Sequence, residues 1–359
     1  MSFAVGPVPP GAAAAPAPAE FRFTQTESFV ELLRRLGASL LVSTYQANKL
    51  LAARAAGGGL SVLVRTFERP MGMAVAPGRL TVGTKNQVWE FRDAPDIAPR
   101  VEPAGAHDAC FLPRHCHVTG DIGVHELAWA GAELWLVNTR FSCLCTLAPD
   151  YSFVPRWRPP FVSALAAEDR CHLNGLGVAD GRPRYATALG QTDVKDGWRA
   201  GKAAGGVVID VPSGEVIARG LCMPHSPRWH GGRLWVLESG TGRLLTLDAG
   251  GRRETVAEVP GFARGLTFAG RHAFVGLSKI RPTSAMAGVP LADRRDELKC
   301  GVAIIALDSG RVEGFLEFQS TVEETFDVQL MPGARFPELV GFQKDDVNHT
   351  FVVPPAAVP

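Results

Sequence analysis

The chain has 359 residues, with 37 Lys+Arg against 36 Asp+Glu and a formal net charge of +1. This balance gives no electrostatic attraction to a nucleic acid or to an anionic membrane surface, so neither is expected as a partner. The hydrophobic fraction of 46% suffices for a large core. No apolar stretch is long enough for a transmembrane helix, so none is expected.

The first segment, residues 1–20, is rich in Pro and Ala and has no basic start. It is therefore interpreted as a disordered leader and not as a signal peptide. The seven cysteines are an odd and unpatterned set. Without a secretion signal, such a set indicates reduced thiols and a cytoplasmic protein. Cys143 and Cys145 share one face of a strand and are interpreted as buried structural thiols.

One helix is predicted over residues 26–38, because a Thr/Ser cap region precedes its apolar pattern and a glycine ends it. We expect it to pack on the rim of the fold. Residues 39–55 then follow a strand–loop–strand plan, and residues 60–68 fit an outer strand. This first unit has no innermost strand of its own.

The same plan returns along the chain, and this repetition is the strongest signal in the sequence. Each copy opens on a glycine-containing turn, which an apolar strand, a short polar loop and a second apolar strand follow. The copies begin roughly 40–50 residues apart, which is the period of four-stranded propeller blades. They cover residues 77–91, 131–147, 181–193, 231–248 and 270–280.

The last part of the sequence completes the ring. Residues 325–343 supply an inner strand without outer ones, which is what the first unit lacks. The two parts together close a six-bladed, all-β propeller and remove its exposed sheet edges. Seven blades remain an alternative if residues 337–343 and 349–353 build a further partial unit. The predicted domain is 21–350, followed by a tail at 351–359.

The starts of the inner strands are unusually polar. One row of equivalent positions holds His125, Asn174, His225 and Arg264, and the row beside it holds Glu126 and Asp327. Because strand residues alternate sides, one of these rows lines the pore. Imidazoles that converge with a carboxylate suit a transition metal such as Zn, Cu, Fe or Mn.

We therefore predict a divalent transition metal held by His125, His172 and His225, with Glu126 or Asp327 as ligand or general base. The alternative is that these groups bond one another and plug a wet channel, since buried polar groups need partners.

Long loops reach the same face as the inner-strand starts. Residues 106–123, 191–206 and 278–301 are expected to converge there as a lid over a pocket. Their cationic side chains could bind a carboxylate or phosphate of a substrate. Arg140, Asn174 and Lys279 are the predicted substrate-binding residues, and Arg264 is the predicted anchor.

Several strings resemble a bacterial family of conserved hypothetical propeller proteins, some of which are joined to tetratricopeptide repeats. The resemblance covers residues 21–345, implies a propeller and assigns no activity. The strings are STYQANKL (43–50), VNTRFSCLCTL (137–147), CHLNGL (171–176) and MPHSPRW (223–229).

More distantly, the blades are similar to gluconolactonase and senescence-marker propellers. Those proteins hold a divalent metal through Glu, Asn, Asn and Asp side chains and open lactones or phosphotriesters. Glu126, Asn174 and Asp327 match three of these residue types. His225 stands where that group has an oxygen ligand, which puts calcium and lactone chemistry in doubt for this chain.

Two functions follow from this interpretation. The first is a metal-dependent enzyme that acts on a small molecule or peptide at the pore mouth, by hydrolytic or oxidative chemistry. The second is a non-catalytic propeller that binds a peptide or protein partner on its rim, with the polar pore as filler.

Overall fold

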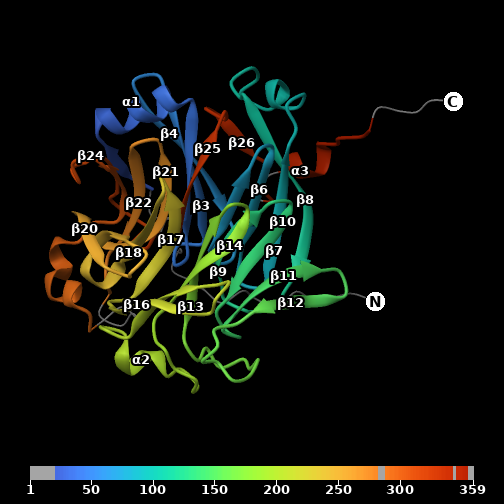
Figure 1. Cartoon of the computed structure of the whole chain (residues 1–359). Helices are drawn as coiled ribbons and strands as arrows, with labels where there is room; N and C mark the ends of the chain where they lie inside the picture. Colours follow the sequence, from blue (N-terminus) through green and yellow to red (C-terminus); the bar gives the residue numbers. More distant parts are fainter. Residues whose placement is uncertain (1–20, 282–287, 343–344, 355–359) are drawn as a thin grey trace, which may run out of the picture.

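The computed structural model describes residues 21–281, 288–342 and 345–354. These residues form six sheets arranged around a central pore, as the repeat predicts (Figure 1). The inner strands of neighbouring sheets contact one another around the ring, and β25 closes it against β5 and β21. The chain is therefore a six-bladed propeller.

Each blade has four antiparallel strands, named in order from the inner strand outward. Blades 1 to 3 are β25 (Asp327–Pro332), β2 (Ala38–Thr44), β3 (Lys49–Ala56) and β4 (Gly59–Thr66); β5 (Met73–Ala76), β6 (Arg79–Gly83), β7 (Gln87–Asp93) and β8 (Ala109–Val118); and β9 (Val124–Ala130), β10 (Glu133–Asn138), β11 (Cys143–Ala148) and β12 (Tyr151–Trp157). Blades 4 to 6 are β13 (Leu173–Ala179), β14 (Arg182–Ala188), β15 (Gly206–Asp210) and β16 (Val216–Leu221); β17 (Pro224–His230), β18 (Arg233–Glu238), β19 (Arg243–Leu247) and β20 (Arg253–Glu258); and β21 (Phe262–Ala269), β22 (His272–Ser278), β23 (Gly301–Ala306) and β24 (Val312–Phe318).

Two short strands extend the outer edges. β1 (Phe23–Gln25) pairs with β24 of blade 6, and β26 (Pro337–Leu339) runs parallel to β8 of blade 2. Residues 337–339 thus extend blade 2, and residues 346–349 form the helix α3 (Asp346–His349). The alternative of a seventh blade is therefore wrong.

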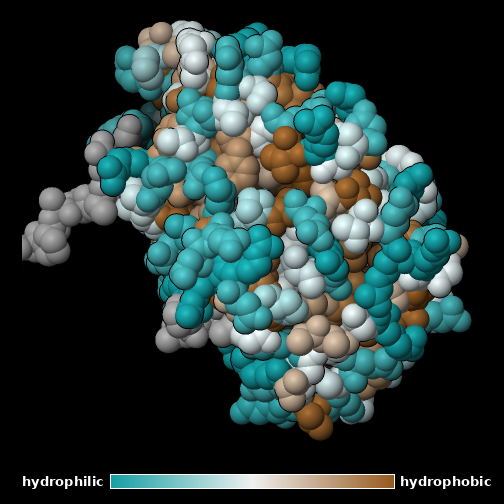
Figure 2. Space-filling model, turned by 90° about the vertical axis from the view of Figure 1, so that its left-hand side faces the viewer, coloured by the Kyte–Doolittle hydropathy of each residue, from teal (hydrophilic) through white to brown (hydrophobic). Residues whose placement is uncertain are grey.

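The helix α1 (Glu27–Leu36) is confirmed with its expected caps. The Thr26 hydroxyl accepts a hydrogen bond from the amide of Phe29, and Gly37 ends the helix at a φ of 58°. Its buried face packs against the hydrophobic cluster between blades 6 and 1. In Figure 1 it lies beside β24, and Figure 2 shows hydrophilic side chains interspersed with hydrophobic ones on this side of the molecule.

The core is divided among the gaps between neighbouring blades, and each gap holds one hydrophobic cluster. The strand alternation explains how one strand serves two clusters. In β2, Leu40 and Val42 point to the cluster with blade 6, whereas Leu41 points to the cluster with blade 2. Each blade is therefore buried on both faces.

The inner strands approach so closely that two glycines are required. A Cβ on Gly72 would lie 2.5 Å from the carbonyl oxygen of His125, and one on Gly265 would lie 2.6 Å from the amide nitrogen of Val328. Gly265 also has a φ of 81°, which other residues rarely adopt. These contacts hold the inner strands in the register that the aligned strand starts predict.

Short helices lie in the loops: η1 (Ala98–Arg100), α2 (Trp198–Gly201), η2 (Ser239–Thr241) and η3 (Pro290–Glu297). The insertions at 191–206 and 278–301 pack together through a hydrophobic cluster around Trp198, Val289 and Leu291. Residues 282–287 of the second insertion lie outside the described residues. The prediction of a loop at 106–123 is wrong, because most of this segment is β8, the outer strand of blade 2.

The leader predicted at 1–20 lies outside the described residues. Among the helices of residues 21–281, 288–342 and 345–354, none combines the length and the apolar character that a membrane span requires. All seven cysteines are free, and Cys143 and Cys145 are buried as expected.

Candidate functional site

Two of the three predicted histidines contact each other at the pore mouth, where the inner strands begin. The rings of His125 and His172 meet edge to face, with their centroids 4.8 Å apart. His125 also packs on Phe326 at 5.2 Å, and His172 packs on Trp198 at 4.3 Å. An aromatic wall therefore holds both imidazoles in place.

A hydrogen-bond relay sets the tautomer of His125. The Thr139 hydroxyl lies 2.6 Å from the carbonyl oxygen of Leu173, and this acceptor takes the only hydroxyl proton. The Nδ1 of His125, 2.7 Å from the same hydroxyl, must therefore donate its own proton. The neutral ring is left with an unprotonated Nε2.

His225, in another blade, has the same arrangement of a ring nitrogen beside a hydroxyl that donates elsewhere. Its Nδ1 lies 2.9 Å from both the Met223 carbonyl oxygen and the Ser239 hydroxyl, and this hydroxyl donates to the carbonyl of Ala263. Thr139 and Ser239 occupy the same place, just after the second strand of their blades. Nε2 of His225 is likewise unprotonated in the neutral form.

His172 is held by a carboxylate. Its Nδ1 lies 2.8 Å from Oδ2 of Asp169, and the same oxygen accepts a hydrogen bond from the indole of Trp198 at 3.1 Å. Both His172 and Asp169 have left-handed backbone conformations, with φ of 49° and 46°. Such strain in residues other than glycine often marks functional sites.

Among the described residues, no carboxylate forms an ion pair with Arg264. Its guanidinium lies 3.7 Å from the centroid of Phe326, and its buried Nε has no hydrogen-bond partner in the described part of the chain. Burial lowers the pKa of Arg264 to about 10, so the group stays charged at neutral pH. Neighbouring carboxylates such as Glu324 and Asp327 act on it only through space. A partly buried guanidinium with an unsatisfied Nε costs stability, which is a reason to look for an anionic ligand.

The histidines beside Arg264 are neutral at pH 7. Burial lowers the pKa of His125 well below its ordinary value of 6.5, and His172, Arg264 and His225 lower it further. Burial and Arg264 likewise lower the pKa of His225. The mouth therefore combines unprotonated ring nitrogens with a permanent cation.

These shifts predict an acid-sensitive fold. Below pH 6.5 the unfolded chain protonates both histidines and the folded chain does not, so the free energy of unfolding falls as the pH drops. Urea unfolding between pH 5 and 8 should show a shallower pH slope for His125→Gln than for the wild type. His115→Gln, at an exposed position on β8, is the control and should keep the wild-type slope. An unchanged slope for His125→Gln would contradict the assignment.

Glu126 and Asp327 are buried on the inner strands and belong to a second set of polar contacts. The two oxygens of Glu126 accept hydrogen bonds from Arg228 at 3.0 and 3.1 Å, and Oε2 also accepts one from the amide of Leu176. Asp327 accepts a hydrogen bond from the amide of Met73. Burial raises the pKa of Asp327 to about 6. These contacts fit the alternative stated above, in which the polar groups of the pore bond one another and fill the channel.

The predicted substrate-binding residues are separated. Asn174 is buried. Its side-chain amide donates to the Pro224 carbonyl of blade 5 and accepts from the Thr187 hydroxyl of blade 4, so it links these two blades. Lys279 follows β22, where its amide bonds Glu323. Arg140 lies beside the histidines and pairs with Asp121 at 3.1 Å.

A cavity of about 360 Å³ opens beside the two touching histidines. His125, His172, Asp169 and Thr139 form its inner side, and Arg140, Lys195 and Arg199 are among its other lining residues. The insertion at 191–206 therefore does line a pocket, as expected. The cavity gives a small molecule access to both imidazoles.

The predicted metal set stays untested. All three histidines have the tautomer that a metal ligand needs, with Nδ1 donating and Nε2 open. However, residues 21–281, 288–342 and 345–354 contain no group of three or more His, Cys, Asp or Glu side chains that could hold a metal ion. The transition metal stays a prediction, which elemental analysis of the purified protein would test.

Four contributors to the mouth and plug were not predicted: Asp169, Thr139, Ser239 and Arg228. Arg228 could have been identified from the sequence, because it is the one cationic residue at the fourth position of the aligned inner strands. The two hydroxyl residues follow equivalent strands and could have been found by aligning strand ends. Asp169 lies in an irregular loop, where no periodic pattern applies.

Comparison with known families and structures adds a family and a fold. Residues 27–340 match the model of a domain of unknown function, DUF4915. No curated protein matches the chain. A protein of unknown function from Bacteroides caccae is 9% identical with a TM-score of 0.52, covering 82% of this chain and 98% of its own.

The structure of a nidogen/laminin complex gives a TM-score of 0.50 at 10% identity, covering 82% of this chain and 99% of that one. A protein provisionally described as a gluconolactonase gives 0.47 at 14% identity, covering 76% and 92%. At these identities the likeness concerns the fold alone.

Proposed function

Because the chain belongs to DUF4915, a family described only as a domain of unknown function, we propose its function from the pore mouth itself. We propose an enzyme that binds a small molecule bearing a carboxylate or phosphate at Arg264 and moves a proton with His172. The observation that carries this proposal is the guanidinium of Arg264 on Phe326, whose buried Nε has no hydrogen-bond partner among the described residues, beside imidazoles with open Nε2 atoms.

The division of roles follows from what each group can do. Arg264 stays charged and supplies up to five N–H donors for an anion. Asp169 orients His172 through Nδ1, so that Nε2 can accept a proton from a bound molecule and return it. His125 and His225 are held neutral and offer hydrogen-bond acceptors without competing for the anion.

The anion class can be tested by thermal shift. A panel of small carboxylates and phosphate monoesters is added to the wild type, and compounds that raise Tm are carried forward. Arg264→Met should abolish these increases, because methionine keeps the apolar stem and removes the guanidinium. Arg311→Met, at an exposed position in the β23–β24 turn, is the control.

The same variant has a second expected property. Arg264→Met should leave the free energy of unfolding unchanged or raise it by up to about 2 kcal/mol, because it removes a partly buried charge with an unsatisfied Nε at the expense of one cation–π contact. Urea unfolding measures this. A loss of more than about 2 kcal/mol would mean that Arg264 serves the fold and not a ligand.

A further inference from the structure

A second cavity, of about 740 Å³, lies on the opposite face of the propeller between blades 4 and 5. We call it the blade 4–5 groove. It is built where β17 ends and β18 begins, together with the β15–β16 turn and the end of β19. The histidine mouth lies where β17 starts, so the two sites are separate.

An aromatic platform forms one end of the groove. The rings of Tyr185 and Trp229 stack with their centroids 6.0 Å apart and an interplanar angle of 30°. Trp229 is 43% exposed, although most tryptophans are largely buried. A partly exposed aromatic pair of this kind is typical of the anchor points at which a partner binds.

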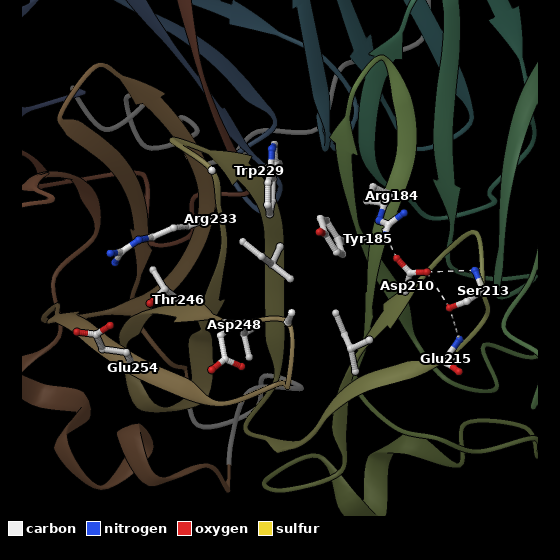
Figure 3. A pocket seen from close by; sticks show the side chains of 15 residues that line it. Arg184, Tyr185, Asp210, Ser213, Glu215, Trp229, Arg233, Thr246, Asp248 and Glu254 are labelled. Carbon is white, nitrogen blue, oxygen red and sulfur yellow. Dashed lines mark hydrogen bonds and ion pairs between the residues drawn. The ribbon is translucent and has the colours of Figure 1, made fainter.

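The floor is apolar and the two walls are acidic. Leu234 and Leu247 lie in the groove lining and are buried. Figure 3 shows Asp248 and Glu254 on one side of the cavity and Asp210 and Glu215 on the other. Each side also carries one guanidinium, Arg233 on the first and Arg184 on the second, so carboxylates outnumber cations on both sides.

The charge balance favours a cation. The lining holds four carboxylates, Asp210, Glu215, Asp248 and Glu254, against two guanidiniums, Arg184 and Arg233. Arg184 is already paired with Asp210 at 2.8 Å. No ion pair joins Glu215 or Glu254 to another described residue. The net negative walls repel phosphates, so a nucleic acid does not fit.

We propose that the blade 4–5 groove binds an extended basic segment of a partner protein. Lysine or arginine stems lie along the apolar floor and their charged ends meet the acidic walls. A proline ring of the same segment stacks on Trp229 and Tyr185, as extended proline-containing peptides do in aromatic-lined grooves. This site is independent of the chemistry proposed for the pore mouth.

Fluorescence anisotropy with two labelled octapeptides tests the proposal. The probe alternates lysine and proline, and its counterpart alternates glutamate and proline. The basic probe should bind and the acidic one should not. Trp229→Ala and Glu254→Lys should each weaken binding at least about tenfold.

Matched controls separate a specific site from general charge attraction. Tyr151→Ala removes another exposed aromatic, on β12, and Glu31→Lys makes the same charge change on α1. Both should stay within about twofold of the wild type. Thermal unfolding of each variant checks that it is folded. Absence of binding, or equal weakening in the controls, would overturn the proposal.

Discussion

Glu126→Ala is expected to destabilise the propeller by about 3–5 kcal/mol, the usual cost of breaking a buried ion pair. The carboxylate accepts two hydrogen bonds from Arg228 and one from Leu176, and only 7% of its side chain is exposed. Removing it leaves the Arg228 guanidinium in the pore without its counter-ion. Urea unfolding at pH 7 measures the loss.

The matched variant removes both charges at once. Glu126→Met combined with Arg228→Met should recover most of the stability, because an apolar pair of similar volume often replaces a buried ion pair at little cost. If Glu126→Ala alone has a free energy of unfolding within about 1 kcal/mol of the wild type, the Glu126–Arg228 pair is not a structural plug of the pore. In that case the predicted catalytic role for Glu126 would return.

His172→Ala is expected to lower the turnover of a substrate found in the anion panel by a factor of about 10² to 10⁴, the usual contribution of a general acid or base. Binding of that compound to Arg264 should persist, so kcat falls while KM changes little. Steady-state kinetics separates the two constants. His115→Ala, on the exposed part of β8, is the control.

Asp169→Asn tests the positioning of this ring. Asp169 holds Nδ1 of His172 and the indole of Trp198, and it is not expected to touch substrate. The variant should lower kcat with an unchanged KM, because the ring loses its fixed orientation. A variant that raises KM alone would give Asp169 a binding role, and full activity would remove His172 from the reaction.

The sequence predicts the propeller well because the fold depends on a repeated local pattern. Strand alternation and glycine turns recur in every blade, so the sequence alone predicts the six blades and the closing strand β25. The α1 helix is predicted from its caps. The alignment of inner strands also holds: Met73, Leu127 and Leu266 pair with Val82, Leu136 and Val275 at equivalent places.

The sequence predicts the site less well because its contacts join distant blades. Glu126 and Arg228 are 102 positions apart and belong to blades that are not neighbours, so neither indicates its partner. The alignment identified the polar rows. It could not show that the carboxylate of Glu126 is paired with Arg228, or that the Nε of Arg264 has no partner among the described residues.

The mistaken loop at 106–123 has a simpler cause. β8 is an outer strand without a clear apolar alternation, and Pro113 lies in it where the register with β7 shifts. A proline is tolerated at such an irregular edge position, although it argues against a strand by pattern alone.

The central claim is that Arg264 binds an anion beside neutral histidines, and imidazole NMR tests it most directly. Protein labelled with ¹⁵N-histidine is titrated at pH 7 with inorganic phosphate and, separately, with acetate. The claim predicts saturable shifts for the His125 and His225 rings in the wild type, none in Arg264→Met, and none at the exposed His115 in either protein. Rings of His125 and His225 that stay unmoved by both anions, or that move equally without Arg264, would contradict it.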